Sequence, residues 1–302
     1  RGPPRRGDAI HNLEMKSMQR KVTRMLLALL CVSMLVAAAS AAPTTELHVV
    51  KIAADGQTVL NETTVDYHWM EANLPGLGDG VTHYYHQGPV FADDKETQWD
   101  RNETTNFKDR GAVKGTDLAD LCDLVGGIEP GDEVMVRAVD GYHIEFGYQN
   151  VYEPEPRQGP IGICWYNGED ADVGERQGVG YPPDYHAAMR LVIFADNSTN
   201  PEGKHVFGNQ DMRDYFPPER LHLFDNLYPS TSGYTVKWLS EVRVYEGGYT
   251  GAKDVPVKSL QGSAAVETTE AQASAQAPPS PDPLFGLLAG LGVASYVWRM
   301  RR

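Results

Sequence analysis

The chain has 302 residues, of which 41% are hydrophobic and 15 are tyrosines, a composition typical of folded proteins rather than of disordered ones. It carries 27 basic and 41 acidic side chains. Without the end segments up to Ala41 and from Asp282 onward, 17 basic and 38 acidic side chains remain, a net charge near −21. A field of this sign repels nucleic acids and anionic membrane surfaces, so nucleic-acid binding is excluded.

Residues 1–41 are interpreted as upstream sequence followed by a secretory signal peptide. Basic residues after Met18 precede an apolar run from Met25 to Ala39, and the run closes on Ala39-Ser40-Ala41. Basic residues, an apolar run and a small-residue cleavage site in this order are typical of signal peptides. The alternative is an uncleaved membrane anchor, which needs about 20 apolar residues to span a bilayer.

Residues 42–250 are expected to form one globular domain. Residues 46–64 predict a strand, a turn at Asp55-Gly56 and a second strand, and the extended pattern continues to Trp69. Residues 74–91 are rich in Gly, Pro, His and Tyr and predict a long loop. A short helix is predicted from Thr116, which can cap it, to Val125, because apolar residues recur there at helical spacing.

The second half of the domain is expected to be mainly β-structure. Residues 133–138 and 142–148 predict a hairpin around Asp140-Gly141, and further strands are predicted at 161–166, 189–194 and 235–245. No repeating strand–helix–strand unit is present. Strands and short helices mixed with long loops predict an α+β fold.

The C-terminal part predicts a disordered stalk at residues 251–283 and a membrane or sorting segment at residues 284–302. The stalk is rich in Ala, Ser, Thr, Gln, Glu and Pro and cannot bury enough apolar surface to offset its ordering entropy. An apolar run from Leu284 to Trp298 and a basic end then resemble sorting signals of the archaeosortase type, in which the tail is cut and a lipid attached. The alternative is a plain C-terminal membrane anchor.

Both alternatives predict an extracellular domain that is anchored at the cell surface. The expected partners are the membrane, through the C-terminal segment or an attached lipid, and other components of the cell envelope. Three Asn-x-Ser/Thr sequons, which are compatible with glycosylation of such a domain, begin at Asn61, Asn102 and Asn197.

Five blocks of sequence follow one another in the order found in one protein family. They are residues 114–122, 131–142, 164–168, 189–192 and 237–242, which include Asp140-Gly141-Tyr142, Asn167-Gly168 and Lys237-Trp238. Together they resemble the sulfite-oxidase-type molybdopterin-binding domain, as found in archaeal, methanogen-like cell-surface proteins with a C-terminal sorting signal. The resemblance covers Val113 to Tyr245 and implies a mixed, barrel-like sheet with short helices and long loops.

The resemblance also implies a molybdopterin cofactor and an oxidoreductase activity. In active members of the family, a cysteine thiolate ahead of the helix binds the metal. Here no cysteine lies between Ala42 and Cys122, and Cys122 falls on the apolar face of the predicted helix, where a thiol is more often part of the core. The missing ligand weighs against the cofactor and against an enzyme.

Two other sets of residues are candidates for special chemistry. Cys122 and Cys164 are able to pair as a disulfide in an oxidising compartment, or to be buried separately as thiols. His83 and His86, with His68 upstream, offer imidazole ligands to zinc or another divalent ion. The alternative for the histidines is a loop whose rings pack over the sheet and bond backbone groups.

We therefore expect an exported, surface-anchored domain with a sulfite-oxidase-like fold that is non-catalytic and serves binding or envelope interactions. Two alternatives remain at this point. One is a molybdopterin-dependent oxidoreductase with atypical ligation. The other is a module that binds a metal or a small ligand.

Overall fold

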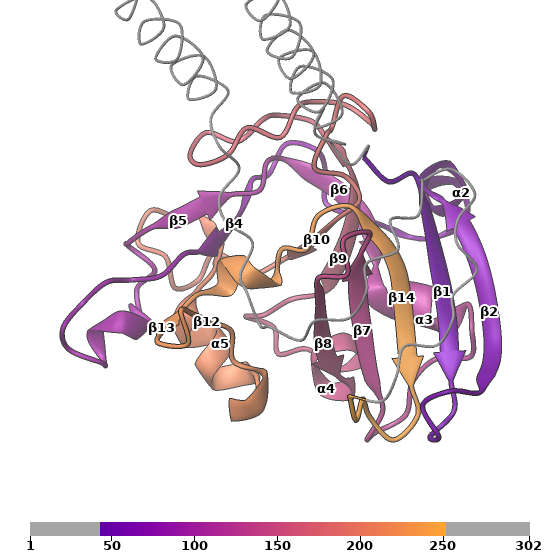
Figure 1. Ribbon diagram of the computed structural model, residues 1–302. Helices are drawn as coiled ribbons and strands as arrows, with labels where there is room; N and C mark the ends of the chain where they lie inside the picture. Colours follow the sequence, from indigo (N-terminus) through magenta and orange to yellow (C-terminus); the bar gives the residue numbers. More distant parts are fainter. Residues whose placement is uncertain (1–42, 252–302) are drawn as a thin grey trace, which may run out of the picture. The chain divides into compact units, whose positions relative to one another are not determined.

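The computed structural model of the protein describes residues 43–251 (Figure 1). Its helices are α2 (Tyr67–Asn73), α3 (Leu118–Asp123), α4 (Tyr148–Tyr152) and α5 (Asn209–Tyr215), with 3-10 turns η1 (Thr97–Trp99), η2 (Pro218–Arg220) and η3 (Thr231–Tyr234). Its strands are β1 (Glu46–Ile52), β2 (Val59–Asp66), β3 (Gly76–Leu77), β4 (Tyr84–Gln87), β5 (Phe107–Asp109), β6 (Val113–Asp117), β7 (Glu133–Ala138), β8 (His143–Gly147), β9 (Ile161–Asn167), β10 (Arg190–Ile193), β11 (His205–Phe207), β12 (Leu223–Phe224), β13 (Tyr228–Pro229) and β14 (Leu239–Tyr245).

The expected signal peptide, the expected C-terminal segment and all but the first residue of the expected stalk lie outside the described residues. Among the helices of residues 43–251, none combines the length and apolarity needed to cross a membrane.

The largest sheet has five strands in the order β2-β1-β14-β7-β8. The predicted hairpins form its two sides, β1 with β2 and β7 with β8. The last strand, β14, lies between them, parallel to β1 and antiparallel to β7 (Figure 1). Because β2 and β8 are free edges, the sheet is open, and the barrel-like form implied by the resemblance is not what this sheet adopts.

A second sheet has four antiparallel strands in the order β10-β9-β6-β3. A three-stranded sheet, β11-β4-β5, and the β12–β13 hairpin complete the β-structure. Figure 1 shows the five-stranded sheet on one side of the domain and α5 with β12 and β13 on the other. Open sheets with a few short helices confirm the predicted α+β class.

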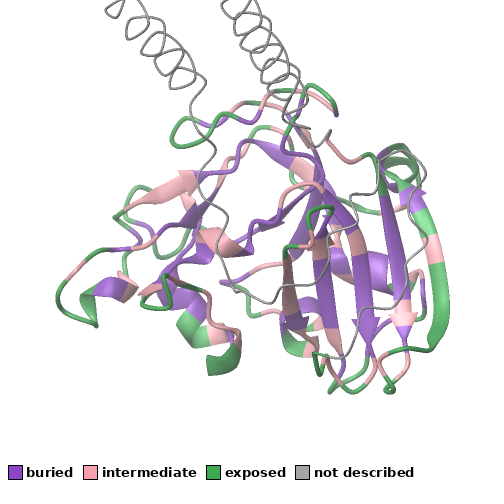
Figure 2. Cartoon of the chain, in the orientation of Figure 1, coloured by how far each residue is buried: buried purple, intermediate pink, exposed green. Residues whose placement is uncertain are grey.

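The main hydrophobic core lies between the two larger sheets and around α3. Successive residues of a strand point to opposite faces, so alternate residues of β1, β7 and β14 meet alternate residues of β9 and β10. Leu118, Leu121 and Cys122 of α3 are fully buried among them. A second cluster, which includes Val113, Tyr185 and Val192, covers the other face of the second sheet. Figure 2 shows buried residues along the central strands.

The start of α3 differs from the prediction. Asp117, not Thr116, caps the helix, because its Oδ1 accepts a hydrogen bond from the amide of Ala119 (3.0 Å). Thr116 instead belongs to β6, and its hydroxyl accepts a hydrogen bond from Nε1 of Trp165 (3.1 Å). The helix therefore begins at Leu118 and is shorter than predicted.

Two other segments were also predicted wrongly. The extended pattern does not continue to Trp69, because Asp66 accepts a hydrogen bond from the amide of Trp69 (2.8 Å) and begins α2 at Tyr67. The 74–91 segment, expected as a loop, contributes β3 and β4. Their pairing partners β5, β6 and β11 lie well beyond the segment in sequence, so no local pattern reveals them.

The core around α3 predicts a large effect of one substitution. We expect Leu121→Ala to lower the free energy of unfolding by about 2–5 kcal/mol, because the lost atoms leave a cavity between the helix and the sheets. Urea unfolding followed by tryptophan fluorescence measures the change. Leu60→Ala on β2, where the side chain is 49% exposed, is the matched control and should shift stability by less than about 0.5 kcal/mol. Equal losses in the two variants would contradict this placement of the core.

Candidate functional site

The candidate site is formed by two arginines that the fold places inside the protein. Arg110 lies between β5 and β6, and Arg190 is the first residue of β10. Arg110 is 6% exposed and Arg190 is 2% exposed. Charged side chains are seldom buried to this degree unless a partner of opposite charge is buried with them. Their neighbours therefore decide what the site can do.

The hydrogen-bond partners of both guanidinium groups are neutral. Arg190 donates to Oε1 of Gln177 (2.6 Å) and to the hydroxyl of Thr235 (3.0 Å). Arg110 donates to the hydroxyl of Ser232 (2.9 Å). Within residues 43–251, neither guanidinium forms an ion pair with a carboxylate. Among the described residues, the two buried positive charges thus have no hydrogen-bonded carboxylate, and Glu175 acts on both only through longer-range electrostatics.

The electrostatics of the site favour negative charge. Burial, and after it the charge of Arg190, holds the pKa of Arg110 well below its ordinary value. Burial also lowers the pKa of Arg190. His86 lies within electrostatic range of both, and burial together with the Arg110 charge keeps its pKa well below the usual value. The site is a small positive region inside an acidic domain.

Three buried polar atoms here have no hydrogen-bond partner in the part of the chain that the structure describes: Nε of Arg110, Nε of Arg190 and Oη of Tyr185. Tyr185 is fully buried and lies within electrostatic range of both arginines. Burial raises the pKa of Tyr185, so its hydroxyl stays protonated and is able to donate. A buried polar group without a partner costs about 1–3 kcal/mol. The two Nε atoms are donors and the tyrosine hydroxyl is able to donate, so an anion that accepts hydrogen bonds suits all three.

Strand register brings these residues together. β10 pairs with β9 so that Arg190 lies opposite Cys164, and residues directly opposite in antiparallel strands point to the same face. That face carries the second hydrophobic cluster, to which Cys164 and Tyr185 belong. Gln177 and Tyr185 both come from the segment between β9 and β10. The second sheet and the segment that covers it therefore supply most of the site.

An exposed ion pair stands beside the buried arginines. Glu175 accepts hydrogen bonds from Nζ of Lys237 at both carboxylate oxygens (2.9 and 2.8 Å), and its side chain is 58% exposed. Burial opposes the negative charge of Glu175, but Lys237, and after it the charges of Arg190 and Arg110, outweigh burial, so the pKa of this carboxyl is lowered. Glu175 is therefore ionised, and Lys237 rather than an arginine is its direct partner.

The structure does not bring the three predicted metal-binding histidines into one site. His86 is fully buried, and its Nε2 accepts a hydrogen bond from the amide of Ile193 (3.1 Å), so Nδ1 carries the proton that it donates to the carbonyl of Thr231 (3.0 Å). Neither ring nitrogen of His86 is left for a metal. His86 thus follows the second of the two interpretations from the sequence, in which the ring packs over the sheet and bonds backbone groups.

The other two histidines have separate surroundings. Nδ1 of His83 lies 2.7 Å from the buried carboxylate of Asp109, and Nε2 lies 3.8 Å from Glu169. His68 is exposed on α2, with its ring 4.1 Å from that of Tyr67. In the part of the chain that the structure describes, no group of three or more His, Cys, Asp or Glu residues is arranged to hold a metal ion. The metal hypothesis for these histidines is therefore not supported.

Cys122 and Cys164 are free, fully buried thiols rather than a disulfide. They belong to different hydrophobic clusters on opposite faces of the second sheet, which keeps them apart. Burial raises the pKa of both thiols, so both stay protonated at neutral pH. Of the two possibilities open from the sequence, separate burial is the one that the structure contains.

These thiols do not fit a molybdenum cofactor held by a cysteine. Such a metal needs a thiolate, and a thiolate forms where the surroundings lower the pKa of the sulfur. Here burial acts in the opposite direction on each described cysteine. The two arginines are suited to an anion, but the metal ligand itself is not provided by this set of residues.

A separate cleft of about 550 Å³ lies beyond the C-terminal end of β14. Its acidic groups are already engaged, because Asp132 accepts hydrogen bonds from the amides of Glu129 and Gly247, and Glu133 pairs with Arg220 and the amide of Tyr249. The arginine site lies near the other end of β14, where Thr235 precedes the strand. We place the candidate site at the arginines, where partners are missing, rather than in this cleft.

The three sequons lie on the surface. The asparagines Asn61, Asn102 and Asn197 are all exposed. Asn61 is in the edge strand β2, and the other two are in loops. Glycosylation of these residues remains a prediction.

No protein-family model matches the chain, and no curated protein is significantly similar to it in sequence. The assignment of a function therefore depends on the geometry of the site.

The residues that form this site do not stand out equally in the sequence. Arg190 has a detectable signal, since it is a charged residue inside the compact apolar strand predicted at 189–194. Arg110 has none, because it ends a polar stretch that predicts exposure. Tyr185 lies in an irregular segment between strands, where burial depends on tertiary packing alone.

The unneutralised charge predicts an unusual stability effect. We expect Arg110→Met to leave the free energy of unfolding within about 1 kcal/mol of the wild type, or to raise it, in buffer without multivalent anions, because one of two buried like charges is removed. Urea unfolding at low ionic strength checks this. Arg176→Met, on a side chain that is 75% exposed, is the control and should be neutral. A loss of several kcal/mol in Arg110→Met would show that the charge is neutralised.

Proposed function

We propose that this chain is an exported, surface-anchored binding module that takes a compact oxyanion, such as sulfate or phosphate, at Arg110 and Arg190. The observation that carries the proposal is a set of three buried groups that are able to donate and have no partner among the described residues, beside two buried cations with no hydrogen-bonded carboxylate there. Such a group is costly unless something negative joins it. A bound anion would accept hydrogen bonds from the unpartnered donors and would also balance the buried positive charge.

The chemistry of the residues suits an oxyanion. A guanidinium group is planar, stays charged and offers several N–H donors, a geometry that matches the oxygens of phosphate, sulfate and carboxylate. Tyr185 adds a hydroxyl donor. At about 4 Å and an effective dielectric constant near 20, each pair of unit charges contributes about 4 kcal/mol. A dianion balances the two arginines in charge, which favours it over a monovalent ion.

The net negative charge of the domain affects which anions are expected to reach the site. The field of the whole domain repels anions, whereas the local field of the two arginines attracts them. Salt screens the long-range repulsion over about 8 Å at physiological ionic strength and affects buried charges much less. Binding is therefore expected to be selective for anions small enough to reach the arginines.

The fold and the location belong to the same proposal. Five blocks that resemble the sulfite-oxidase-type domain fall on or next to elements around the core: β6 with α3, the β7–β8 hairpin, β9, β10 and β14. We take them as support for a fold of this type. Surface display rests on the signal-like sequence of residues 1–41 and on the stalk and tail of residues 251–302. A molybdenum-dependent oxidoreductase is not favoured, because the described thiols are buried and protonated.

Thermal unfolding in the presence of different anions tests the proposal. Sulfate or phosphate at 100 times its dissociation constant is expected to stabilise the wild type by about 2.7 kcal/mol, because it binds only the folded state. Sodium chloride at the same ionic strength should stabilise it much less, and acetate shows whether a carboxylate suffices.

Two arginine variants separate site binding from a general salt effect. Arg190→Gln should lose the anion-specific stabilisation, because it removes one of the two charges. Arg176→Gln, on the same covering segment but exposed, should keep it. If sulfate and phosphate act no more strongly than chloride, or if both variants respond like the wild type, the proposal fails.

A further inference from the structure

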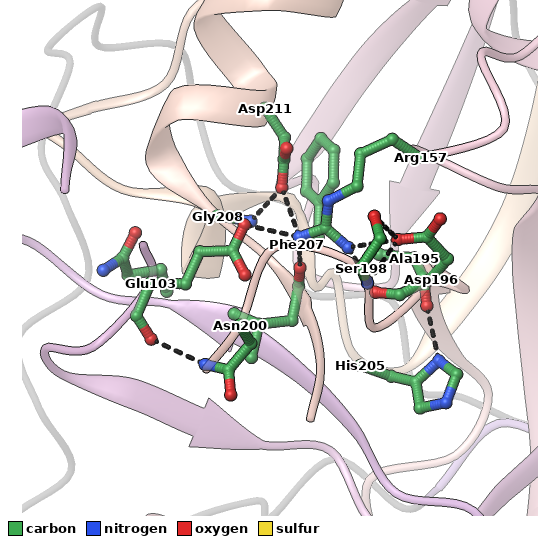
Figure 3. A network of polar contacts seen from close by, with 12 residues as sticks. Glu103, Arg157, Ala195, Asp196, Ser198, Asn200, His205, Phe207, Gly208 and Asp211 are labelled. Carbon is green, nitrogen blue, oxygen red and sulfur yellow. Dashed lines mark hydrogen bonds and ion pairs between the residues drawn. The ribbon is translucent and has the colours of Figure 1, made fainter. Parts of the chain in front are cut away.

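A second buried charge cluster surrounds Arg157 and has the opposite imbalance. Figure 3 shows the guanidinium group of Arg157 between Asp211 of α5 and Asp196, which follows β10. Glu103, from the loop between η1 and β5, is the third acidic partner. The side chains of Glu103 and Asp211 are 0% and 7% exposed, whereas Asp196 is 43% exposed. One cation therefore faces two buried carboxyl groups and one solvated carboxylate.

The geometry leaves the buried pair with too few donors. Glu103 and Asp211 both bond the same nitrogen of Arg157, Nη2, which also donates to the carbonyl of Val206. Asp211 receives a second hydrogen bond from the amide of Gly208 (2.7 Å). The second carboxyl oxygen of Glu103, Oε2, is buried and has no hydrogen-bond partner among the described residues. A proton held between the two carboxyl groups would remove one negative charge and occupy a free oxygen.

The backbone conformation and close packing around Glu103 place its side chain in this cluster. Its backbone has a φ of 53°, in the left-handed region that residues other than glycine seldom adopt, and its carbonyl accepts a hydrogen bond from Asn200 (3.0 Å). Gly208 leaves room for the side chain, since a Cβ there would lie 2.5 Å from Cγ of Glu103. Asp100 and Asn106, at the ends of the same loop, also have positive φ values. The loop thus holds three residues other than glycine in the left-handed region, and Glu103 is the one whose side chain is fully buried.

We infer that Glu103 and Asp211 share one proton beneath Arg157, and that loss of this proton as the pH rises loosens the 100–106 loop from α5. Without the proton, two buried carboxylates face one guanidinium group, and their repulsion acts on the side chain that anchors the loop. With the proton, one carboxyl group donates to the other and the cluster is balanced. The inference does not depend on the proposed anion site.

The surrounding charges agree with a retained proton. Burial, and then the charge of Asp211, raises the pKa of Glu103 to about 8 from an ordinary value of 4.5, against the opposing effect of Arg157. Burial also raises the pKa of Asp211, again against Arg157. The remaining charged groups are Asp196, which is solvated and bonded by Ser198, and Asp100 on the same loop, which is bonded by Gln87. The cluster contains no second cation among the described ion pairs.

The direction of the pH effect follows from the raised pKa. The folded state holds the proton up to about pH 8, while the unfolded chain releases it near pH 4.5. Stability from this cluster is therefore complete below about pH 4.5, declines as the pH rises towards 8, and stays at its lower level above that. A single proton changes the unfolding equilibrium constant by at most tenfold per pH unit, which is about 1.4 kcal/mol.

Urea unfolding of the full chain between pH 5 and pH 9 tests the inference. In Glu103→Gln, the amide mimics the protonated carboxyl group and does not titrate. The unfolding equilibrium constant of the wild type, divided by that of the variant, should therefore rise by up to tenfold per pH unit between pH 5 and about pH 8. Asp211→Asn should give the same result by removing the other titrating partner. Glu96→Gln is the control, because Arg213 lowers the pKa of this exposed carboxyl and it is ionised throughout the range.

Amide hydrogen exchange of residues 100–106 provides a local measurement. After correction for the intrinsic rate, protection in the wild type should fall between pH 6 and pH 9, while protection in Glu103→Gln should not. The inference is overturned if both variants keep the pH dependence of the wild type, or if the loop exchanges equally at the two pH values. If Glu103→Gln does not fold, Asp211→Asn and the wild-type exchange profile decide the question.

Discussion

The second sheet, β10-β9-β6-β3, is covered on both faces, and this constraint shapes the rest of the domain. Every side chain of β10 and nearly every side chain of β9 is buried, so a charged residue in either strand has no route to solvent. Arg190 is such a residue, and within residues 43–251 its guanidinium donates hydrogen bonds only to the neutral groups of Gln177 and Thr235. Arg110 is buried beside it. The positive charge that defines the candidate site is thus a consequence of how the sheet is packed.

Local sequence patterns predicted much of the β-structure, but they did not predict α2 or β4. The hairpin at Asp55-Gly56 and the strands around Asp140-Gly141 depend on neighbours in the chain, and both were predicted. The α2 helix was missed because it has only seven residues and follows an extended strand directly, with Asp66 as the one signal of a helix start. β4 was missed because β5 and β11 stabilise it from a distance. Pairing with strands far away in the sequence produces no periodic pattern of apolar residues by which β4 could be recognised.

The candidate site was harder to predict than the fold. The density of His83 and His86 in one segment suggested ligands, yet β4 directs His86 inward, where its ring joins Ile193 to Thr231. What sets the candidate site apart is the lack of hydrogen-bond partners for its buried donors among the described residues, and this lack becomes visible only when every neighbour of Arg110 is known. The Arg157 cluster was equally hard to predict, since its two buried acids come from a loop (Glu103) and from α5 (Asp211), which lie far apart in the sequence.

The place of β14 in the first sheet has a consequence for biosynthesis. It is the last strand of the described domain, yet it lies between β1 and β7, so His48 pairs with Glu241 across almost the whole domain. One edge of β1 stays open until the chain through Tyr245 has emerged from the ribosome. Pairings between such distant residues slow folding and prolong the exposure of unpaired strands. The five-stranded sheet is therefore completed late, and nascent chains that stop short of β14 leave the backbone groups of β1 and β7 along this gap unpaired and open to other chains.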